Sequence, residues 1–215
     1  MSSAAEGKAR TFDDASRRRV LDRRLVVGVD IDGVLGDQIA GVIPRIARDH
    51  GVRLTFDMID DYRFVLGSVS IADEIAKAQS SRDYVEEMPT FSGARQMLEA
   101  LRQDHRVIIV TARSPEIRDA TRSWLARRRL AHDGLVFTAE AGKSAHGLDV
   151  LVDDYVDNLV DFLTRTPGLA ILVRRPWNRR DEALRPFLAS HRALVATQLE
   201  EIPAMIRTAY RRRPD

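Results

Sequence analysis

The chain of 215 residues contains no cysteine, which excludes disulfide bonds and any metal site built on thiolate ligands. A clear charge excess is missing too, because 34 lysines and arginines stand against 32 aspartates and glutamates. The net charge of +2 gives no argument for a nucleic-acid-binding protein, although the isoelectric point of about 9.2 is basic.

Long hydrophobic runs are also absent. No early apolar segment resembles a signal peptide, and none reaches the length needed to cross a bilayer. Hydrophobic residues still make up 44% of the chain, enough to bury a substantial core. We therefore expect a cytoplasmic protein with no membrane partner, and leave a homodimer open as its assembly.

Arginines gather at both ends of the chain, at positions 17–19, 23–24 and 211–213. Such ends are most often solvated tails, so nucleic acid is disfavoured as a partner. The predicted organisation is a basic N-terminal segment at 1–24 and one core domain at 25–215 that carries an insertion at about 37–90.

Short apolar runs alternate with segments of helical spacing. The runs are brief and rich in β-branched residues, as buried strands are, at residues 25–29, 107–110, 135–137, 150–152 and 170–173. Apolar residues in the intervening segments recur at helical spacing. This alternation predicts an α/β protein with a Rossmann-like parallel sheet and helices on both faces.

About seventy residues separate the helix that begins near Asp37 from the apolar run at 107, far more than one crossover needs. We expect a small helical cap here, inserted after the first strand. Its aromatic residues Tyr62, Phe64 and Tyr84 are candidates to cover the leaving group of a substrate. The competing interpretation is that they form the core of the cap itself.

Polar residues follow four of the apolar runs, at the edge where open α/β sheets bind ligands. Singly, each has an ordinary explanation as a helix cap or a surface residue. Their shared position indicates one site. The residues are Asp30 and Asp32 after the first run, Thr111 and Arg113 after the second, Lys143 after the third, and Asp153 and Asp154 after the fourth.

The spacing of Asp30 and Asp32 predicts that both carboxylates lie on one side of an extended chain. Like charges held close need a cation between them. Because no histidine or cysteine accompanies these aspartates at metal-ligand spacing, the site offers oxygen ligands, which suit Mg²⁺. A carboxylate beside a metal and a fixed lysine is suited to forming an aspartyl-phosphate.

These residues resemble the four motifs of the haloacid dehalogenase-like hydrolase superfamily. The motifs occur in order as Asp30-Ile31-Asp32-Gly33-Val34, Thr111, Lys143 and Asp153-Asp154. Within the superfamily the chain looks most like the 5'(3')-deoxyribonucleotidase branch, on the basis of Val110-Thr111-Ala112-Arg113, the cap after the first motif and the segment Arg175-Pro176-Trp177-Asn178-Arg179.

The resemblance implies a role for each matched residue. Asp30 would be the nucleophile and Asp32 the general acid and then base. Thr111 and Lys143 would hold the transferred phosphoryl group, and Ala112 and Arg113 are further candidates for substrate binding.

The resemblance also implies the metal ligands. Mg²⁺ would be held by Asp30, the backbone carbonyl of Asp32 and Asp154, with Asp153 in support. Which of Asp153 and Asp154 is the direct ligand stays open at this stage.

The function expected on these grounds is a Mg²⁺-dependent phosphatase of a small phosphate monoester, plausibly a nucleotide. Alternatives are a phosphatase of a sugar phosphate or secondary metabolite, and a phosphomutase, which would have to shield its aspartyl-phosphate from water. A non-enzymatic module that binds nucleic acid through the arginine-rich ends is disfavoured by the presence of every motif residue.

Overall fold

The computed structural model describes residues 24–138 and 142–212. The arginines at 17–19, Arg23 and Arg213 lie outside these ranges, so the interpretation of the arginine-rich ends is not addressed by the structure. Among the described helices, none combines the length and the apolar character needed to cross a membrane.

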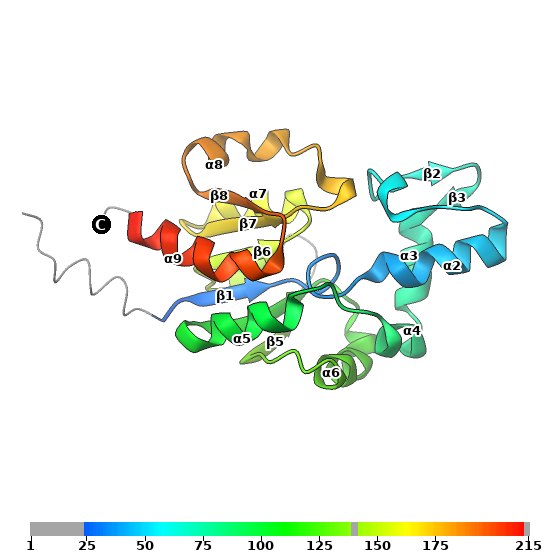
Figure 1. Cartoon of the computed structure of the whole chain (residues 1–215), viewed down its shortest axis with the longest axis horizontal. Helices are drawn as coiled ribbons and strands as arrows, with labels where there is room; N and C mark the ends of the chain where they lie inside the picture. The colour runs from blue at the N-terminus through cyan, green and yellow to red at the C-terminus, as the bar shows by residue number, and fades with distance from the viewer. Residues whose placement is uncertain (1–23, 139–141, 213–215) are drawn as a thin grey trace, which may run out of the picture.

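Six parallel strands form a single sheet in the order β5-β4-β1-β6-β7-β8, with β1 near its centre (Figure 1). Five of them coincide with the five predicted runs. The sixth, β8, was not predicted, because its sequence Ala-Leu-Val-Ala has only one β-branched residue. The strands are β1 (Val26–Val29), β4 (Arg106–Thr111), β5 (Gly134–Phe137), β6 (Val150–Asp153), β7 (Leu169–Val173) and β8 (Ala193–Ala196).

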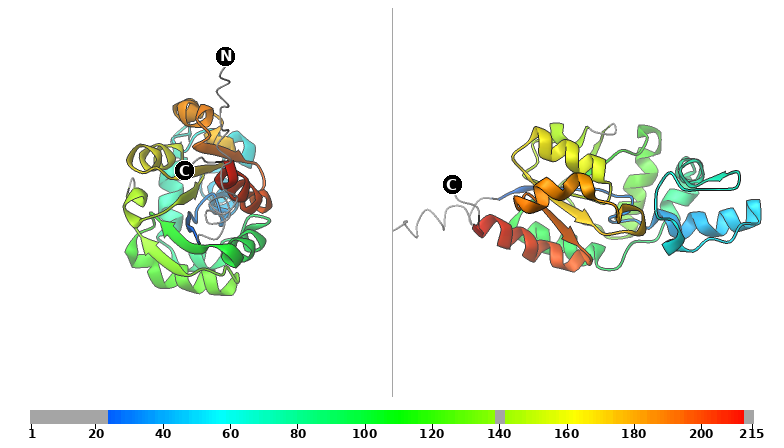
Figure 2. Two further views of the ribbon diagram at one scale, coloured as in Figure 1. Left: turned by 90° about the vertical axis from the view of Figure 1, so that its left-hand side faces the viewer. Right: turned by 90° about the horizontal axis from the view of Figure 1, so that it is seen from above.

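Helices cover both faces of this sheet (Figures 1 and 2), as predicted. One face packs on α5 (Ala94–Asp104), α6 (Arg118–Arg127) and α9 (Ile202–Arg212). The other packs on α7 (Val156–Arg165) and α8 (Arg185–Ala189). Alternate residues of each strand enter opposite layers: Ile109 belongs to the first cluster and Ile108 and Val110 to the second. Both faces are therefore apolar, as parallel sheets require.

The segment between β1 and α5 forms the cap, which lies beyond the carboxyl ends of the strands (Figure 1). It is mainly helical, as predicted, but it also contains a hairpin. Its elements are α2 (Gln38–His50), β2 (Val65–Leu66), β3 (Val69–Ser70), α3 (Ile71–Gln79) and α4 (Arg82–Glu87). The cap has a hydrophobic cluster largely of its own, to which the core contributes Ala120 and Trp177.

The cap leaves and rejoins the core at neighbouring points. Asp37 begins α2 and accepts hydrogen bonds from the backbone N–H groups of Ile39 and Ala40. The backbone N–H of Asp37 donates to the carbonyl of Pro89 at 2.9 Å. These contacts fix the cap beside the turn that follows β1.

Candidate active site

The carboxyl ends of β1, β4 and β6 meet at the middle of the sheet. Val29 pairs with Ile109 on one side and with Val152 on the other. Asp30 follows directly, and its backbone N–H donates to the carbonyl of Val152 at 3.0 Å. This register brings the first carboxylate next to the end of β6.

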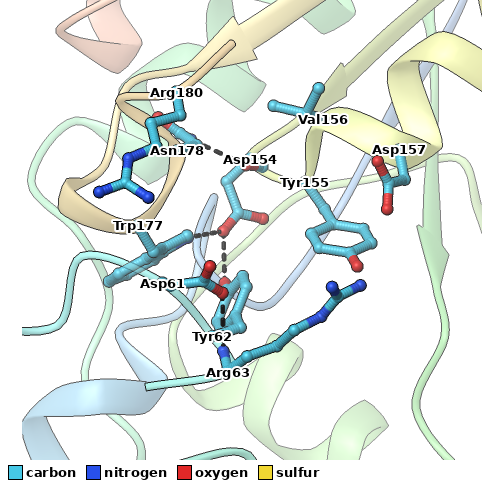
Figure 3. A pocket seen from close by; sticks show the side chains of 10 residues that line it. All are labelled: Asp61, Tyr62, Arg63, Asp154, Tyr155, Val156, Asp157, Trp177, Asn178 and Arg180. Carbon is cyan, nitrogen blue, oxygen red and sulfur yellow. Dashed lines mark hydrogen bonds between the residues drawn. The ribbon is translucent and has the colours of Figure 1, made fainter. Parts of the chain in front are cut away.

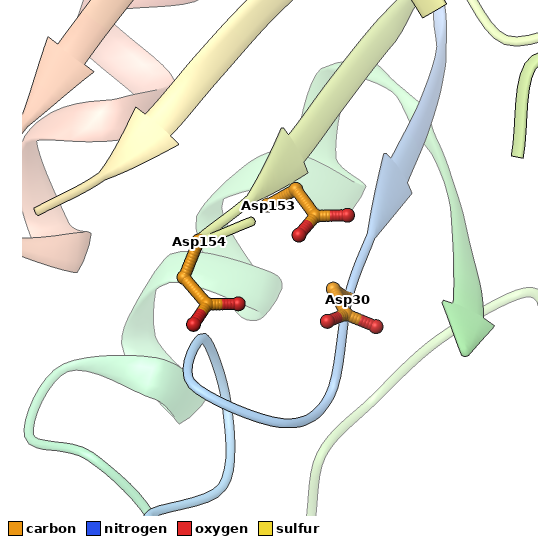
Figure 4. A group of neighbouring side chains, drawn as sticks. All are labelled: Asp30, Asp153 and Asp154. Atoms are coloured by element: carbon orange, nitrogen blue, oxygen red, sulfur yellow. The ribbon is translucent and has the colours of Figure 1, made fainter. Parts of the chain in front are cut away.

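Asp30, Asp153 and Asp154 form a buried group of carboxylates whose nearest oxygens all lie within 4.8 Å of one another (Figure 4). Lys143 lies between two of them, with its Nζ 2.8 Å from Asp30 Oδ1 and 2.7 Å from Asp153 Oδ2. Its side chain is only 2% exposed. The structure therefore brings together four of the predicted site residues.

These charges shift one another's protonation. Burial raises the pKa of Asp30 well above its usual value; Lys143 opposes this, and Asp153 and Asp154 add to it. Burial, together with Asp153, raises the pKa of Asp154 to about 7. Burial alone would lower the pKa of Lys143, but Asp153 and Asp30 outweigh it, so that pKa lies above its usual value. Three carboxylates share one ammonium, an arrangement that a divalent cation would relieve.

The two neighbouring aspartates of the fourth motif have different surroundings. Asp153 has both oxygens occupied: Oδ1 accepts from the backbone N–H of Tyr155, and Oδ2 accepts from Lys143 and Asn158. Asp154 uses only Oδ2, which accepts from Tyr62 at 2.5 Å and from Trp177 at 2.7 Å (Figure 3). Within the described residues no donor reaches Asp154 Oδ1. That free oxygen favours Asp154 over Asp153 as a direct metal ligand.

Asp32 lines the same cavity as Asp30, but it lies on a turn and not on the extended chain that its spacing predicted. The chain leaves the extended conformation after Asp30 and turns through residues 31–36, so the two-residue alternation of a strand no longer applies. The Asp32 carboxylate lies outside the three-carboxylate group and forms two hydrogen bonds with the guanidinium of Arg113. The structure therefore does not bring the Asp32 side chain and Asp30 into one metal-binding group.

Gly33, in the same turn, is required by the site. Its φ of +80° is in the left-handed region, and a Cβ at this position would come within 2.0 Å of Asp154 Oδ2. The turn is also held from the other side, because Arg175 Nε donates to the Gly33 carbonyl at 2.7 Å. Glycine here lets the turn after the first motif approach the carboxylate of the fourth.

A cavity of about 380 Å³ opens above the carboxylates, between core and cap. The predicted residues Asp30, Asp32, Tyr62, Thr111, Ala112, Arg113, Lys143 and Asp154 line it, together with Gln38, Arg63, Ala72, Ile75, Ala76, Gln79, Tyr155 and Asn158. The second group was not predicted. Helical periodicity identifies the buried face of a cap helix, but it does not say which of its polar residues face a cavity.

Of the three candidate aromatic residues in the cap, only Tyr62 lines this cavity. Tyr84 is a buried member of the hydrophobic cluster of the cap, and Phe64, like Tyr62, packs against that cluster. Tyr84 also donates a hydrogen bond to the carbonyl of Gln38. These positions match the competing interpretation, in which Phe64 and Tyr84 form part of the core of the cap. A stacking role for Phe64 has no support from its position.

Tyr62 joins the cap to the core. Its hydroxyl donates to Asp154 and accepts from Gln38 Nε2 at 3.0 Å, and Gln38 in turn accepts from Gln79 at 2.9 Å. Figure 3 shows the contact from the side of a second, smaller cavity of about 170 Å³. Tyr62 and Asp154 line both cavities.

Replacing Tyr62 by phenylalanine should lower kcat/KM for the best substrate about tenfold, a loss of about 1.4 kcal/mol. The change leaves Gln38 without its acceptor and removes one of the two donors to Asp154. Steady-state kinetics and a Mg²⁺ titration would measure it. Phe64→Leu is the matched control, since it alters the cap interior and should affect stability more than kcat/KM. Equal kinetic losses in both variants would contradict this role of Tyr62.

Comparison of the sequence with known protein families finds a family whose profile matches most of the chain. A profile of the family described as "5' nucleotidase, deoxy (Pyrimidine), cytosolic type C protein" matches residues 24–190. Two bacterial proteins are similar over a comparable length. "Putative nucleotidase BH1399" from Halalkalibacterium halodurans is 26% identical over 158 residues, which are 71% of this chain and 80% of that protein. "Putative nucleotidase YqfW" from Bacillus subtilis is 24% identical over 72% of this chain and 83% of that protein.

Solved structures share the fold at low sequence identity. The haloacid dehalogenase-like family protein SP0104 from Streptococcus pneumoniae superimposes with a TM-score of 0.58 at 16% identity, covering 85% of this chain and 98% of that one. YfnB from Bacillus subtilis, described as a HAD-hydrolase bound to magnesium, gives a TM-score of 0.54 at 14% identity, with 86% and 99% covered.

Proposed function

Because the chain belongs to the family of cytosolic type C 5' nucleotidases for deoxy (pyrimidine) substrates, we propose that it releases phosphate from nucleotides through an aspartyl-phosphate on Asp30. It is a phosphoric monoester hydrolase of the haloacid dehalogenase superfamily, so its substrate is a small phosphate ester. The observation that carries the proposal is the position of Asp30, which ends the central strand, contacts Lys143 at 2.8 Å and faces the cavity under the cap.

In the first step a carboxylate oxygen of Asp30 attacks phosphorus, and the ester P–O bond breaks. Asp32 gives a proton to the departing oxygen. Asp32 then accepts a proton from water, whose oxygen attacks phosphorus, and the bond to Asp30 breaks to release inorganic phosphate. Lys143 keeps Asp30 oriented, and Thr111 and Lys143 bind oxygens of the phosphoryl group.

The buried carboxylates fit a hard cation, because all their ligand atoms are oxygens and only one ammonium balances them. Asp30, Asp154 and the backbone carbonyl of Asp32 would hold Mg²⁺. When bound, the ion supplies positive charge beside the phosphoryl oxygens. Asp153 supports the site by holding Lys143 and Asn158 in place.

A panel of monoesters tests the substrate class. With Mg²⁺ present, nucleoside monophosphates should give the highest kcat/KM, and sugar phosphates of similar charge should be hydrolysed at least about tenfold less efficiently, because a nucleoside is the larger leaving group and can contact more of the cavity under the cap. Phosphate release measures the rate. Product analysis separates hydrolysis from phosphoryl migration, since a phosphomutase would give an isomerised ester. A preference for sugar phosphates would contradict the nucleotide assignment.

A further inference from the structure

Arg113 and Asp32 form a two-pronged ion pair beside the nucleophile. Arg113 Nε donates to Asp32 Oδ2 at 2.7 Å, and Nη2 donates to Oδ1 at 2.6 Å. The Arg113 side chain is 1% exposed and that of Asp32 15% exposed. This parallel geometry fixes the plane of a carboxylate as well as its position.

The guanidinium is itself held by groups other than Asp32. Nη1 donates to Thr121 on α6 at 3.3 Å, and Nη2 lies 3.3 Å from the sulfur of Met88. Its centre lies 5.6 Å from the centroid of the Trp124 ring, and Trp124 Nε1 donates to the Met88 carbonyl. Arg113 is thus a fixed element of the core, and Asp32 takes its orientation from it.

This arrangement leaves little for Arg113 to offer a substrate. Its Nε, Nη1 and Nη2 all donate to protein groups, and its side chain is nearly inaccessible. Asp32, in contrast, keeps further lone pairs on its two oxygens. The side chain that can exchange a proton with a ligand in the cavity is therefore Asp32, and Arg113 contacts the ligand only through Asp32.

The pair also separates Asp32 from the carboxylate group. Lys143, which lines the same cavity as Asp32, already serves Asp30 and Asp153. If Asp32 turned towards Lys143, a fourth carboxylate would compete for a single ammonium.

We propose that Arg113 is a positioning residue: it holds the Asp32 carboxylate away from Lys143 and in the orientation needed for proton exchange with the leaving group and with water. Arg113 acts through Asp32 and does not bind the phosphate ester. This inference rests on the proposed function, in which Asp32 transfers the proton.

A double-mutant cycle tests the inference, with kcat and KM measured for Asp32→Asn, Arg113→Lys, Arg113→Ala and the double variants. Arg113→Ala should lower kcat about 10- to 100-fold and change KM less than about threefold, because proton transfer is lost while substrate binding is kept. Arg113→Lys should recover part of the loss, since it keeps the charge without the fork. In the Asp32→Asn background, neither change at Arg113 should lower kcat further.

Arg175→Lys is the matched control. Arg175 also lies against an aromatic ring, that of Phe91, and binds the same turn through the Gly33 carbonyl, but it makes no contact with Asp32. Its effect on kcat should be the same with Asp32 or Asn at position 32. Melting temperatures would identify any variant that fails to fold. If Arg113→Ala fails to fold, the cycle can still be completed with Arg113→Lys.

Two results would overturn the assignment while leaving the proposed function intact. One is an additive loss of kcat in the double variants; the other is a rise in KM as large as the fall in kcat, which would mean that Arg113 binds the ester directly. A wild-type protein that releases phosphate from no ester would overturn the proposed function and this assignment together.

Discussion

Asp30→Asn should abolish phosphate release, with a fall in kcat of at least about 10³-fold on every ester that the wild-type protein hydrolyses. Asparagine keeps the shape of the side chain and can still accept a hydrogen bond from Lys143. It cannot form the acyl phosphate, because its amide is a poor nucleophile. Acid-quenched wild-type enzyme should gain the mass of one phosphoryl group during turnover, and the variant should not.

The same substitution should leave the fold intact. Burial raises the pKa of Asp30, so its ionised form is less favourable in the folded protein than in the unfolded chain. This cost is present above the folded-state pKa and vanishes as the pH falls below the unfolded value. At about pH 8 without metal, Asp30→Asn should melt no lower than wild type.

Asp104→Asn, on the surface at the end of α5, is the matched change in charge and should retain full activity. Turnover by purified Asp30→Asn near the wild-type rate would refute the nucleophile assignment.

Removal of divalent cations should eliminate activity, and Mg²⁺ should restore it. The carboxylate group has three acidic side chains and one ammonium, so added positive charge stabilises the folded protein as well as the reaction. Mg²⁺ at about 100 times its Kd should raise the unfolding free energy by about 2.7 kcal/mol. A thermal melt with and without Mg²⁺ measures this independently of turnover.

Variants of Asp154 and of its partner Trp177 should test the assignment of Asp154 as a metal ligand. Asp154→Asn should abolish most of the Mg²⁺-dependent rise in melting temperature. Trp177→Phe removes one donor to Asp154 Oδ2 and should weaken Mg²⁺ binding about 10- to 100-fold. Thr111→Val, which changes no carboxylate or carboxylate partner, is the control for both. Full activity in metal-free buffer, or unchanged Mg²⁺ binding by Asp154→Asn, would contradict this metal site.

Much of the core could be predicted because its determinants are local. Short β-branched runs between helical segments predicted five strands, and polar residues directly after them predicted Asp30, Thr111, Asp153 and Asp154 at one edge. In an open α/β sheet the carboxyl ends of the parallel strands lie at the same edge, so residues at strand ends are brought near one another. Lys143 was predicted less directly, because it lies on a short 3₁₀ helix (Lys143–His146) several residues after the third run and not at the end of a strand.

The parts that sequence reasoning missed depend on contacts between distant segments. The pair between Asp32 and Arg113 spans 81 positions, and the bond from Trp177 to Asp154 joins the segment after β7 to the end of β6. Asp30 and Asp32 were expected on one side of an extended chain; both line the cavity, but Asp32 reaches it from the turn at residues 31–36 and not from the strand. No local sequence pattern predicts which distant acceptor an arginine or a tryptophan side chain will hydrogen-bond to in the folded protein.

The attachment of the cap to the core has a consequence for how such an enzyme changes over evolutionary time. The chain departs after Asp37 and returns at Pro89, and one backbone hydrogen bond of 2.9 Å joins these two points. Because the endpoints are already closed, residues 38–87 could be exchanged for a module of another length at little entropic cost to the sheet, with Met88 kept as part of the core. Such an exchange would change the residues that cover the cavity while leaving the carboxylates and Lys143 in place. To keep full activity, a new module would also have to replace the hydrogen bond that Tyr62 now donates to Asp154.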